Sequence, residues 1–223
     1  MGDQTELDDF YEALKNGVSV DTFLRRYDEI FPIIHKLGFT EDYRLGRGKL
    51  KCLSDEITPV ARFCRFHTRV HDKICFALDE TYPDCIIEFD NGRRLEVEVT
   101  VANALKRKNL MTELNNSGKG RGFINVHEDA PHQDFLNSME AEPKAYSTDE
   151  VIECVRHDLL LRAERKKFHQ GDTLLVELDL VILPSCRWQE HLATFSREVE
   201  SLSFENIFLT GRGSRGDLCM RIK

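Results

Sequence analysis

The sequence lacks an apolar run long enough to cross a membrane, and no basic segment followed by an apolar one opens it. A membrane-spanning helix needs about 20 apolar residues, and a secretory leader needs a basic stretch before its apolar core. We therefore expect no signal peptide and no membrane partner. The seven cysteines show no Cys-x-x-Cys spacing, which argues against a disulfide framework or a structural zinc site and favours a cytoplasmic protein.

Positive charge is also in short supply, since the 223 residues carry a net charge of −8. Taken as a whole, this charge speaks against a constitutive nucleic-acid binder. The acids, however, concentrate in residues 1–30 and 128–153, where they outnumber the bases by five and by seven. The rest of the chain is basic overall. This predicts a basic functional surface, with the acidic segments lying away from it.

The most informative segment is residues 83–100, in which two short extended runs flank Asp90-Asn91-Gly92. Asn-Gly between alternating apolar residues is the strongest short-range signal for a β-hairpin. A two-residue loop would place charged side chains among the apolar ones. A three-residue loop with Gly92 in the left-handed conformation gathers the apolar side chains on one face, so we predict the three-residue loop.

This register places Asp84 directly across from Glu98, with Glu96 two residues along the same strand. Like charges that face each other across two strands destabilise a sheet. A bound Mg²⁺ ion would offset the repulsion, because Mg²⁺ is usually held by one or two carboxylates together with water and substrate phosphate. The alternative is a solvated hairpin face on which salt screens the repulsion.

Pro83-Asp84, a hydrophobic strand, a turn and then Glu96-Val97-Glu98 together resemble the PD-(D/E)xK nuclease superfamily. There, a strand-borne Asp and a Glu-x-Lys on the next strand bind metal and cleave phosphodiesters. The resemblance implies that Asp84 and Glu96 bind Mg²⁺ or Mn²⁺. Glu98 stands where the lysine would be, as a further metal ligand or as the base that orients water. Some restriction endonucleases of the superfamily carry Glu-x-Glu there, whereas other relatives with altered sites only bind.

Basic residues outside the hairpin supply the remaining candidates for the site. Where a superfamily member lacks the strand lysine, a neighbouring helix can present a base to the scissile phosphate, and Lys106, in a helix predicted at 102–114, is the fourth catalytic candidate. Basic glycine-containing loops can track phosphates. They predict nucleic-acid contacts by five residues: Arg47, Lys119, Arg121, Arg212 and Arg215.

The order of predicted elements indicates an α/β fold with a mixed sheet flanked by helices. We expect a helical N-terminal extension at residues 1–55 and a restriction-endonuclease-like core at 56–223, with a long helix from Thr58 to Leu78. Residues 43–51 and 211–216 are expected to be loops. The superfamily core normally has a strand before the Pro-Asp strand, and the sequence offers no candidate between residues 39 and 82. Acids of the preceding helix can join the metal site in this superfamily, which adds Asp72 and Glu80.

These observations favour a metal-dependent nuclease that acts on DNA, or on RNA. The alternative is a non-catalytic accessory protein on a nuclease-like fold, which binds nucleic acid, or a protein partner through its acidic N-terminal helices. The chain could also form a homodimer. A second pair of acids, Glu177 and Asp179 on the apolar segment 173–183, competes with the hairpin for the site.

Overall fold

The computed structural model describes residues 2–79, 81–118, 126–140, 145–166, 173–178, 180, 183–213 and 215–223. These residues form a mixed seven-stranded sheet whose strands follow one another in sequence order. They are β1 (Val18–Ser19), β2 (Lys73–Phe76), β3 (Cys85–Glu88), β4 (Arg94–Val101), β5 (Thr173–Glu177), β6 (Asn206–Gly213) and β7 (Gly216–Arg221). Strands β4, β5 and β6 are parallel and every other pairing is antiparallel, so the predicted mixed α/β class is confirmed.

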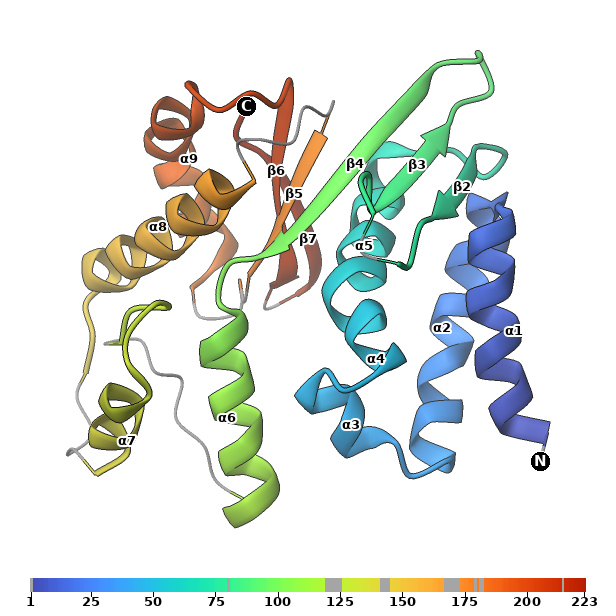
Figure 1. Cartoon of the computed structure of the whole chain (residues 1–223). Helices are drawn as coiled ribbons and strands as arrows, with labels where there is room; N and C mark the ends of the chain where they lie inside the picture. The colour runs from blue at the N-terminus through green and yellow to red at the C-terminus, as the bar shows by residue number, and fades with distance from the viewer. Residues whose placement is uncertain are drawn as a thin grey trace.

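Helices cover both faces of the sheet (Figure 1). They are α1 (Gly2–Asn16), α2 (Val20–Lys36), α3 (Thr40–Leu45), α4 (Lys49–Cys52), the π-helix η1 (Leu53–Ile57), α5 (Thr58–His67), α6 (Ala104–Ser117), α7 (His132–Glu140), α8 (Thr148–Arg165) and α9 (Ser185–Val199). A capping box begins α8, with the side chains of Ser147 and Glu150 each accepting a hydrogen bond from the other's backbone N–H. No helix in the described ranges combines the length and apolar character that a bilayer span requires.

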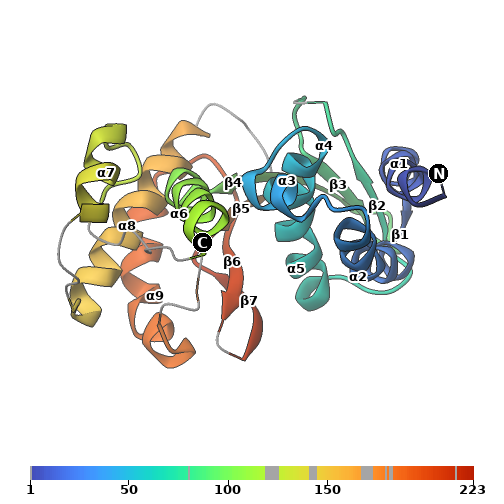
Figure 2. The ribbon, with the colours of Figure 1, turned by 90° about the horizontal axis from the view of Figure 1, so that it is seen from below.

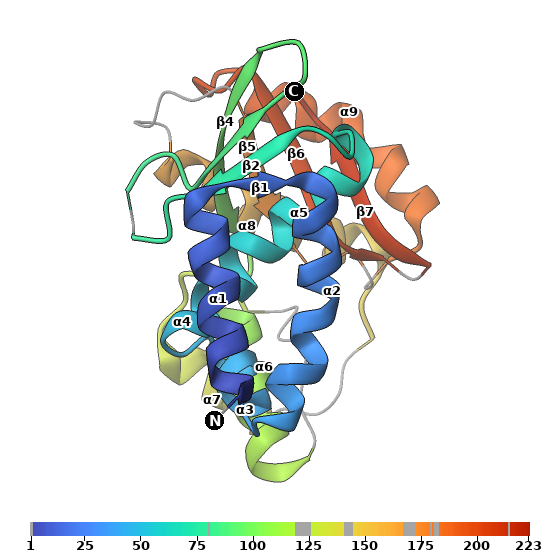
Figure 3. The same ribbon diagram turned by 90° about the vertical axis from the view of Figure 1, so that its right-hand side faces the viewer.

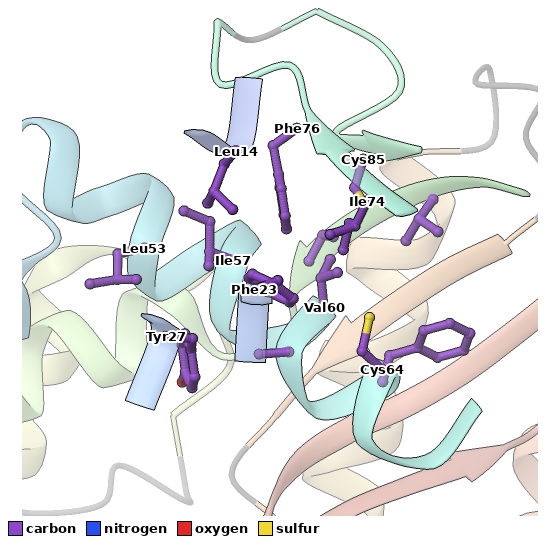
Figure 4. Close-up of a cluster of buried hydrophobic side chains, with 14 of the residues drawn as sticks. Leu14, Phe23, Tyr27, Leu53, Ile57, Val60, Cys64, Ile74, Phe76 and Cys85 are labelled. Atoms are coloured by element: carbon purple, nitrogen blue, oxygen red, sulfur yellow. The ribbon is translucent and has the colours of Figure 1, made fainter. Parts of the chain in front are cut away.

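One core lies between the N-terminal helices and the first four strands. Phe23 of α2 and Val60 of α5 pack there with Ile74 of β2 and Cys85 of β3, all almost fully buried (Figure 4). Figure 3 shows α1 and α2 side by side, with β1 at the bend between them. Burying one large apolar side chain contributes about 1.5–3 kcal/mol, so α1 and α2 are stabilised through the same core as the sheet.

A second core covers the opposite face of the parallel strands. Leu174 and Val176 of β5 pack there against Leu159 of α8 and Trp188 of α9. Leu175, between them in sequence, belongs to the first core. A parallel strand that is buried on both faces explains the continuous apolar run that the sequence shows at this point.

The hairpin of β3 and β4 has the predicted register. Ile86 pairs with Glu96 and Glu88 pairs with Arg94. The backbone N–H of Gly92 donates to the carbonyl of Phe89, and Gly92 has φ +80°. The three-residue loop is therefore confirmed, as is the sharing of one face by the apolar residues, since Leu95, Val97 and Val99 all belong to the first core.

The predicted helix from Thr58 to Leu78 is wrong in its second half. Helix α5 ends at His67, and residues 73–76 form β2 between β1 and β3. Ile74 and Phe76 are buried whereas Lys73 is exposed, the alternation of a strand. In the sequence, these residues also fit the apolar stripe of the preceding helix, and they are therefore predicted as part of it. Residues 73–76 form a strand because they pair with β1 on one side and with β3 on the other. The sheet thus has a strand before Asp84, where none had been expected.

The two segments expected to be loops are mostly regular structure. Residues 43–51 contribute to α3 and α4. Residues 211–216 extend β6 to Gly213 and begin β7 at Gly216. Gly211 is required where it stands, because a Cβ there would lie 2.0 Å from the carbonyl oxygen of Leu178. The glycine that suggested a flexible loop instead permits close approach of backbone to backbone.

Candidate functional site

Asp84 lies immediately before β3, at the end of the hairpin far from its turn. Its carboxylate Oδ2 accepts a hydrogen bond of 2.7 Å from the backbone N–H of Val99, and its carbonyl accepts one of 3.1 Å from Ala77. The first bond replaces the ladder bond that β4 would otherwise receive from the backbone of β3. Asp84 is therefore fixed on both sides by neighbouring strands.

Glu56 lies near Asp84 and comes from η1, on the face of the sheet that the first core covers. It belongs to η1, a type of helix that is rare and often found at functional sites, and η1 packs against β4. Burial and, after it, the nearby charge of Asp84 raise the pKa of Glu56 to about 7. A carboxyl group with such a pKa exchanges its proton near neutral pH, which is the property of a candidate functional group.

Glu98 and Glu96 are held apart from this pair. Glu98 lies on the face covered by α8, where its 3% exposed side chain forms an ion pair with Lys166. Glu96 is partly exposed and lies 3.8 Å from Arg94. Among the described residues, no three His, Cys, Asp or Glu side chains are grouped so that they could hold a metal ion. The expected trio of Asp84, Glu96 and Glu98 is thus not assembled as a ready cage.

Lys106 is buried and its charge is paired. Its ammonium group lies 2.5 Å from Asp158 and 2.9 Å from the sulfur of Cys154. Burial by itself would lower the pKa of Lys106, but its hydrogen bonds to Asp158 and Cys154 outweigh that effect and raise it. Lys106 is therefore a charged structural anchor between α6 and α8.

A groove of about 390 Å³ lies where α3, α4, α6 and α8 approach one another. Figure 2 shows α6 between α8 and α3. We call this hollow the basic groove, because five cations and one carboxylate line it: Arg44, Lys51, Arg107, Lys108, Arg162 and Asp55. In a chain of net charge −8, this local excess of positive charge favours a polyanionic ligand.

Some cations of the basic groove form ion pairs and others do not. Arg107 pairs with Asp55, and Arg162 pairs with the buried Glu128. The ammonium groups of Lys51 and Lys108 are exposed and form no ion pair or hydrogen bond within the described part of the chain. Those two lysines are consequently available to phosphate.

Lys51 and Asp55 connect the basic groove to Glu56. Lys51 lines the groove and at the same time acts electrostatically on Glu56, whose pKa it lowers. Asp55, the other shared member, precedes Glu56 directly and lies in the groove wall. The lining of the groove thus reaches the residues on either side of Glu56 in the fold, while Glu56 and Asp84 themselves are not part of it.

Of the residues predicted to contact nucleic acid, the three that the structure describes do not gather in one place. Arg47 is exposed and pairs with Asp42 at 3.2 Å and Glu41 at 3.6 Å. Arg212 lines a different hollow, at the end of β5, and Arg215 is exposed in the turn between β6 and β7. Lys119 and Arg121 lie outside the described residues.

The remaining acidic candidates have structural roles or fall outside the described chain. Asp72 is buried and accepts hydrogen bonds from the backbone of Arg69 at 2.6 Å and of Asp90 at 3.1 Å. Glu177 pairs with Arg62 and accepts a bond of 2.9 Å from Thr210. Glu80 and Asp179 lie outside the described residues.

Reasoning from the sequence missed Glu56. A usable signal was present, since Asp55 and Glu56 directly precede Thr58-Pro59, where the expected helix began. The expectation that acids of the preceding helix join the site named Asp72 and Glu80, which lie beyond the C-terminal end of α5, whereas Glu56 lies just before its N-terminal end. Comparison of the chain with protein-family models, curated proteins and solved structures gives no match, so the functional interpretation depends on this geometry alone.

Proposed function

We propose that this protein hydrolyses phosphodiester bonds of nucleic acid, with DNA as the first expected substrate, at the Glu56–Asp84 pair. One observation carries the proposal: burial and, after it, the charge of Asp84 raise the pKa of Glu56 to about 7, and Lys51, which acts electrostatically on Glu56, also lines a groove with four other cations. Structural carboxylates are normally placed next to a compensating cation, whereas catalytic ones are held together and perturbed.

Mg²⁺ or Mn²⁺ is the cofactor that the donor set fits. Two carboxylates that repel each other gain most from a divalent cation between them, and Mg²⁺ commonly takes only one or two protein carboxylates while water and substrate phosphate complete its shell. Glu56 and Asp84 would hold the ion. When bound, it would supply a more acidic water as nucleophile and stabilise negative charge on the phosphate.

The protein groups around the pair have separate tasks. The N–H of Val99 holds Asp84 in place. Without the ion, Glu56 exchanges its proton near neutral pH because of its raised pKa, and it must release that proton to hold the ion. Lys51 and Lys108 bind phosphates on the groove side, as exposed ammonium groups do through electrostatic attraction.

The arrangement of elements adds support from the family resemblance. Helix α5 precedes three antiparallel strands, β2, β3 and β4, and the chain then passes through helices to the parallel strand β5. This order supplies the strand before Pro83-Asp84 that the superfamily core requires. It favours a nuclease-like reading of Asp84, with Glu56 in place of Glu96 as its partner.

The test is a cleavage assay with plasmid, linear, single-stranded and RNA substrates in Mg²⁺, Mn²⁺ and EDTA. The wild type should cut at least one substrate with either metal, and Asp84→Asn should lose about 10²-fold or more of the rate. Asn retains an oxygen that can accept the Val99 bond, so the variant should stay folded. Cleavage that survives Asp84→Asn, or the absence of cleavage on all substrates, would overturn the proposal.

A non-catalytic nucleic-acid-binding protein is the second candidate. The observation that favours it is the neutralisation of two expected catalytic side chains, Glu98 by Lys166 and Lys106 by Asp158. Such a protein would bind nucleic acid through the basic groove, with an affinity that falls steeply with salt, and would show no metal-dependent cleavage.

A further inference from the structure

A second hollow, of about 350 Å³, lies at the carboxyl ends of the parallel strands β4 and β5. Ligands of open α/β sheets preferentially bind outside the carboxyl ends of their strands, and this volume falls in the range of small-molecule sites. We call it the strand-end pocket. Its lining comes from α5, α6, α8 and the ends of β4, β5 and β6.

Most charges around the strand-end pocket are already paired. Arg62 binds Glu177 and Asp217, Lys106 binds Asp158, and Arg107 binds Asp55. These ion pairs make the polar wall rigid and leave it little capacity for a further charged ligand. The pocket's specificity must therefore come from the polar groups that are not engaged.

Two polar residues of the lining are free to bind a ligand. The guanidinium group of Arg212 and the side-chain amide of Asn103 form no hydrogen bond or ion pair with any residue in the described ranges. Arg212 is exposed, on the strand that Gly211 holds against Leu178. Asn103 is half-buried at the start of α6. One is a cation and the other is both a donor and an acceptor.

The other walls are apolar. Leu110 and Met111 of α6 face the pocket together with Val151 and Val155 of α8. Aliphatic walls and a methionine accommodate a flat ring and make favourable contacts with it. The pocket thus offers an apolar slot, one amide and one free cation.

We propose that the strand-end pocket binds a single nucleotide unit. The base would lie between the aliphatic walls, with its polar edge on the amide of Asn103, and the phosphate would pair with Arg212. Asn can bond a base edge in two places, and Arg is suited to phosphate. Arg107 lines both this pocket and the basic groove, so a strand in the groove has a route to it. The inference depends on the proposed nucleic-acid substrate but not on cleavage.

The nucleotide unit has two sources, a free nucleoside monophosphate or one unstacked nucleotide of a bound single strand. Calorimetry of the full chain in EDTA with the four nucleoside monophosphates, with a nucleoside and with inorganic phosphate measures the shared chemistry. At least one monophosphate should bind ten times more tightly than phosphate or the nucleoside alone. Arg212→Ala should remove that advantage over the nucleoside, and Asn103→Ala should reduce discrimination among bases.

Arg197→Ala on α9 is the matched control, because Arg197 is an exposed cation outside both hollows. Competition separates the two sources: a short single strand displaces the monophosphate if the pocket takes a nucleotide of the strand, and binds alongside it if the ligand is free. Both results support the pocket. Monophosphate binding no tighter than that of phosphate, or equal in the wild type and in Arg212→Ala and Asn103→Ala, overturns it. Monophosphate binding without any cleavage would overturn the catalytic proposal alone.

Discussion

Lys166, the residue that caps the end of α8, forms an ion pair with Glu98 of β4 beneath it. Only one carboxylate oxygen of Glu98 is engaged, and the other is buried without a hydrogen-bond partner among the described residues. The pair joins α8 to the sheet on the side away from Glu56. It also explains how a strand facing a helix tolerates an acid at a position where the resemblance implies a metal site.

Replacing Lys166 by Met should destabilise the protein by at least about 2 kcal/mol, because it leaves a buried carboxylate without its cation. Adding Glu98→Leu to the same protein should restore most of the loss, since an apolar pair of similar volume needs no charge compensation. Urea denaturation of the single and double variants measures both steps. Equal stability of Lys166→Met and wild type would show that the ion pair contributes nothing.

The raised pKa of Glu56 predicts how stability depends on pH. A carboxyl group whose pKa rises from 4.5 when unfolded to about 7 when folded binds protons more tightly in the folded state. Its contribution is therefore fully present at acidic pH and is lost as the pH rises through about 7. Glu56→Gln should exceed the wild type by about 1–2 kcal/mol at pH 8, after allowance for solvent screening.

At pH 5 the same substitution should make little difference to the free energy of unfolding, because Glu56 is then protonated in the folded protein. Thermal denaturation of both proteins between pH 5 and 8, in EDTA, provides the comparison. Glu88→Gln, on an exposed position of β3, is the control for loss of one negative charge. A wild-type advantage that grows with pH would contradict the assignment.

The basic groove predicts salt-dependent binding. Reversing both free lysines, in Lys51→Glu with Lys108→Glu, should weaken binding of a DNA duplex strongly. The slope of log affinity against log salt should fall by about 0.9 for each phosphate contact removed. Arg197→Glu on α9 changes the charge by the same amount per site and should leave the slope unaltered. Fluorescence anisotropy across a salt series gives the slopes, and indistinguishable slopes for all three proteins would exclude the groove.

The close approach of β6 to the end of β5 predicts unequal effects of two alanines. Gly211→Ala brings a Cβ within 2.0 Å of the backbone oxygen of Leu178, whereas Gly213→Ala meets a terminal carbon of the Leu218 side chain at 2.5 Å. A side chain can move aside but a paired strand cannot. Gly211→Ala should thus cost about 3 kcal/mol or more, and Gly213→Ala clearly less. Equal losses in the free energy of unfolding for the two variants, measured by urea denaturation, would count against this packing.

The hairpin could be predicted from sequence because its pattern is local. Alternating apolar residues and Asp90-Asn91-Gly92 fix the register without help from the rest of the chain. The helix α5 and strand β2 could not be separated in this way, because Ile74 fits both an apolar helical stripe and a strand alternation. The choice depends on β1 and β3, which approach from distant parts of the sequence.

In the candidate site, too, a residue marked by its local sequence could be predicted and one brought in from a distant part of the sequence could not. Asp84 was identified from its place before a strand. Its partner could not be, since Glu56 is 28 positions earlier in the printed sequence and reaches Asp84 only after η1 packs on β4. The basic groove depends in the same way on α3, α6 and α8 meeting in space.

We propose that Glu56, and not Glu96, completes the metal-binding pair with Asp84. Calorimetric titration of Mn²⁺ into wild type, Glu56→Gln and Glu96→Gln at pH 8 tests it most directly, because each variant loses one carboxylate and keeps its shape. We expect wild type and Glu96→Gln to bind the ion alike and Glu56→Gln to bind it at least tenfold more weakly. Undiminished binding by Glu56→Gln, together with loss in Glu96→Gln, would contradict it.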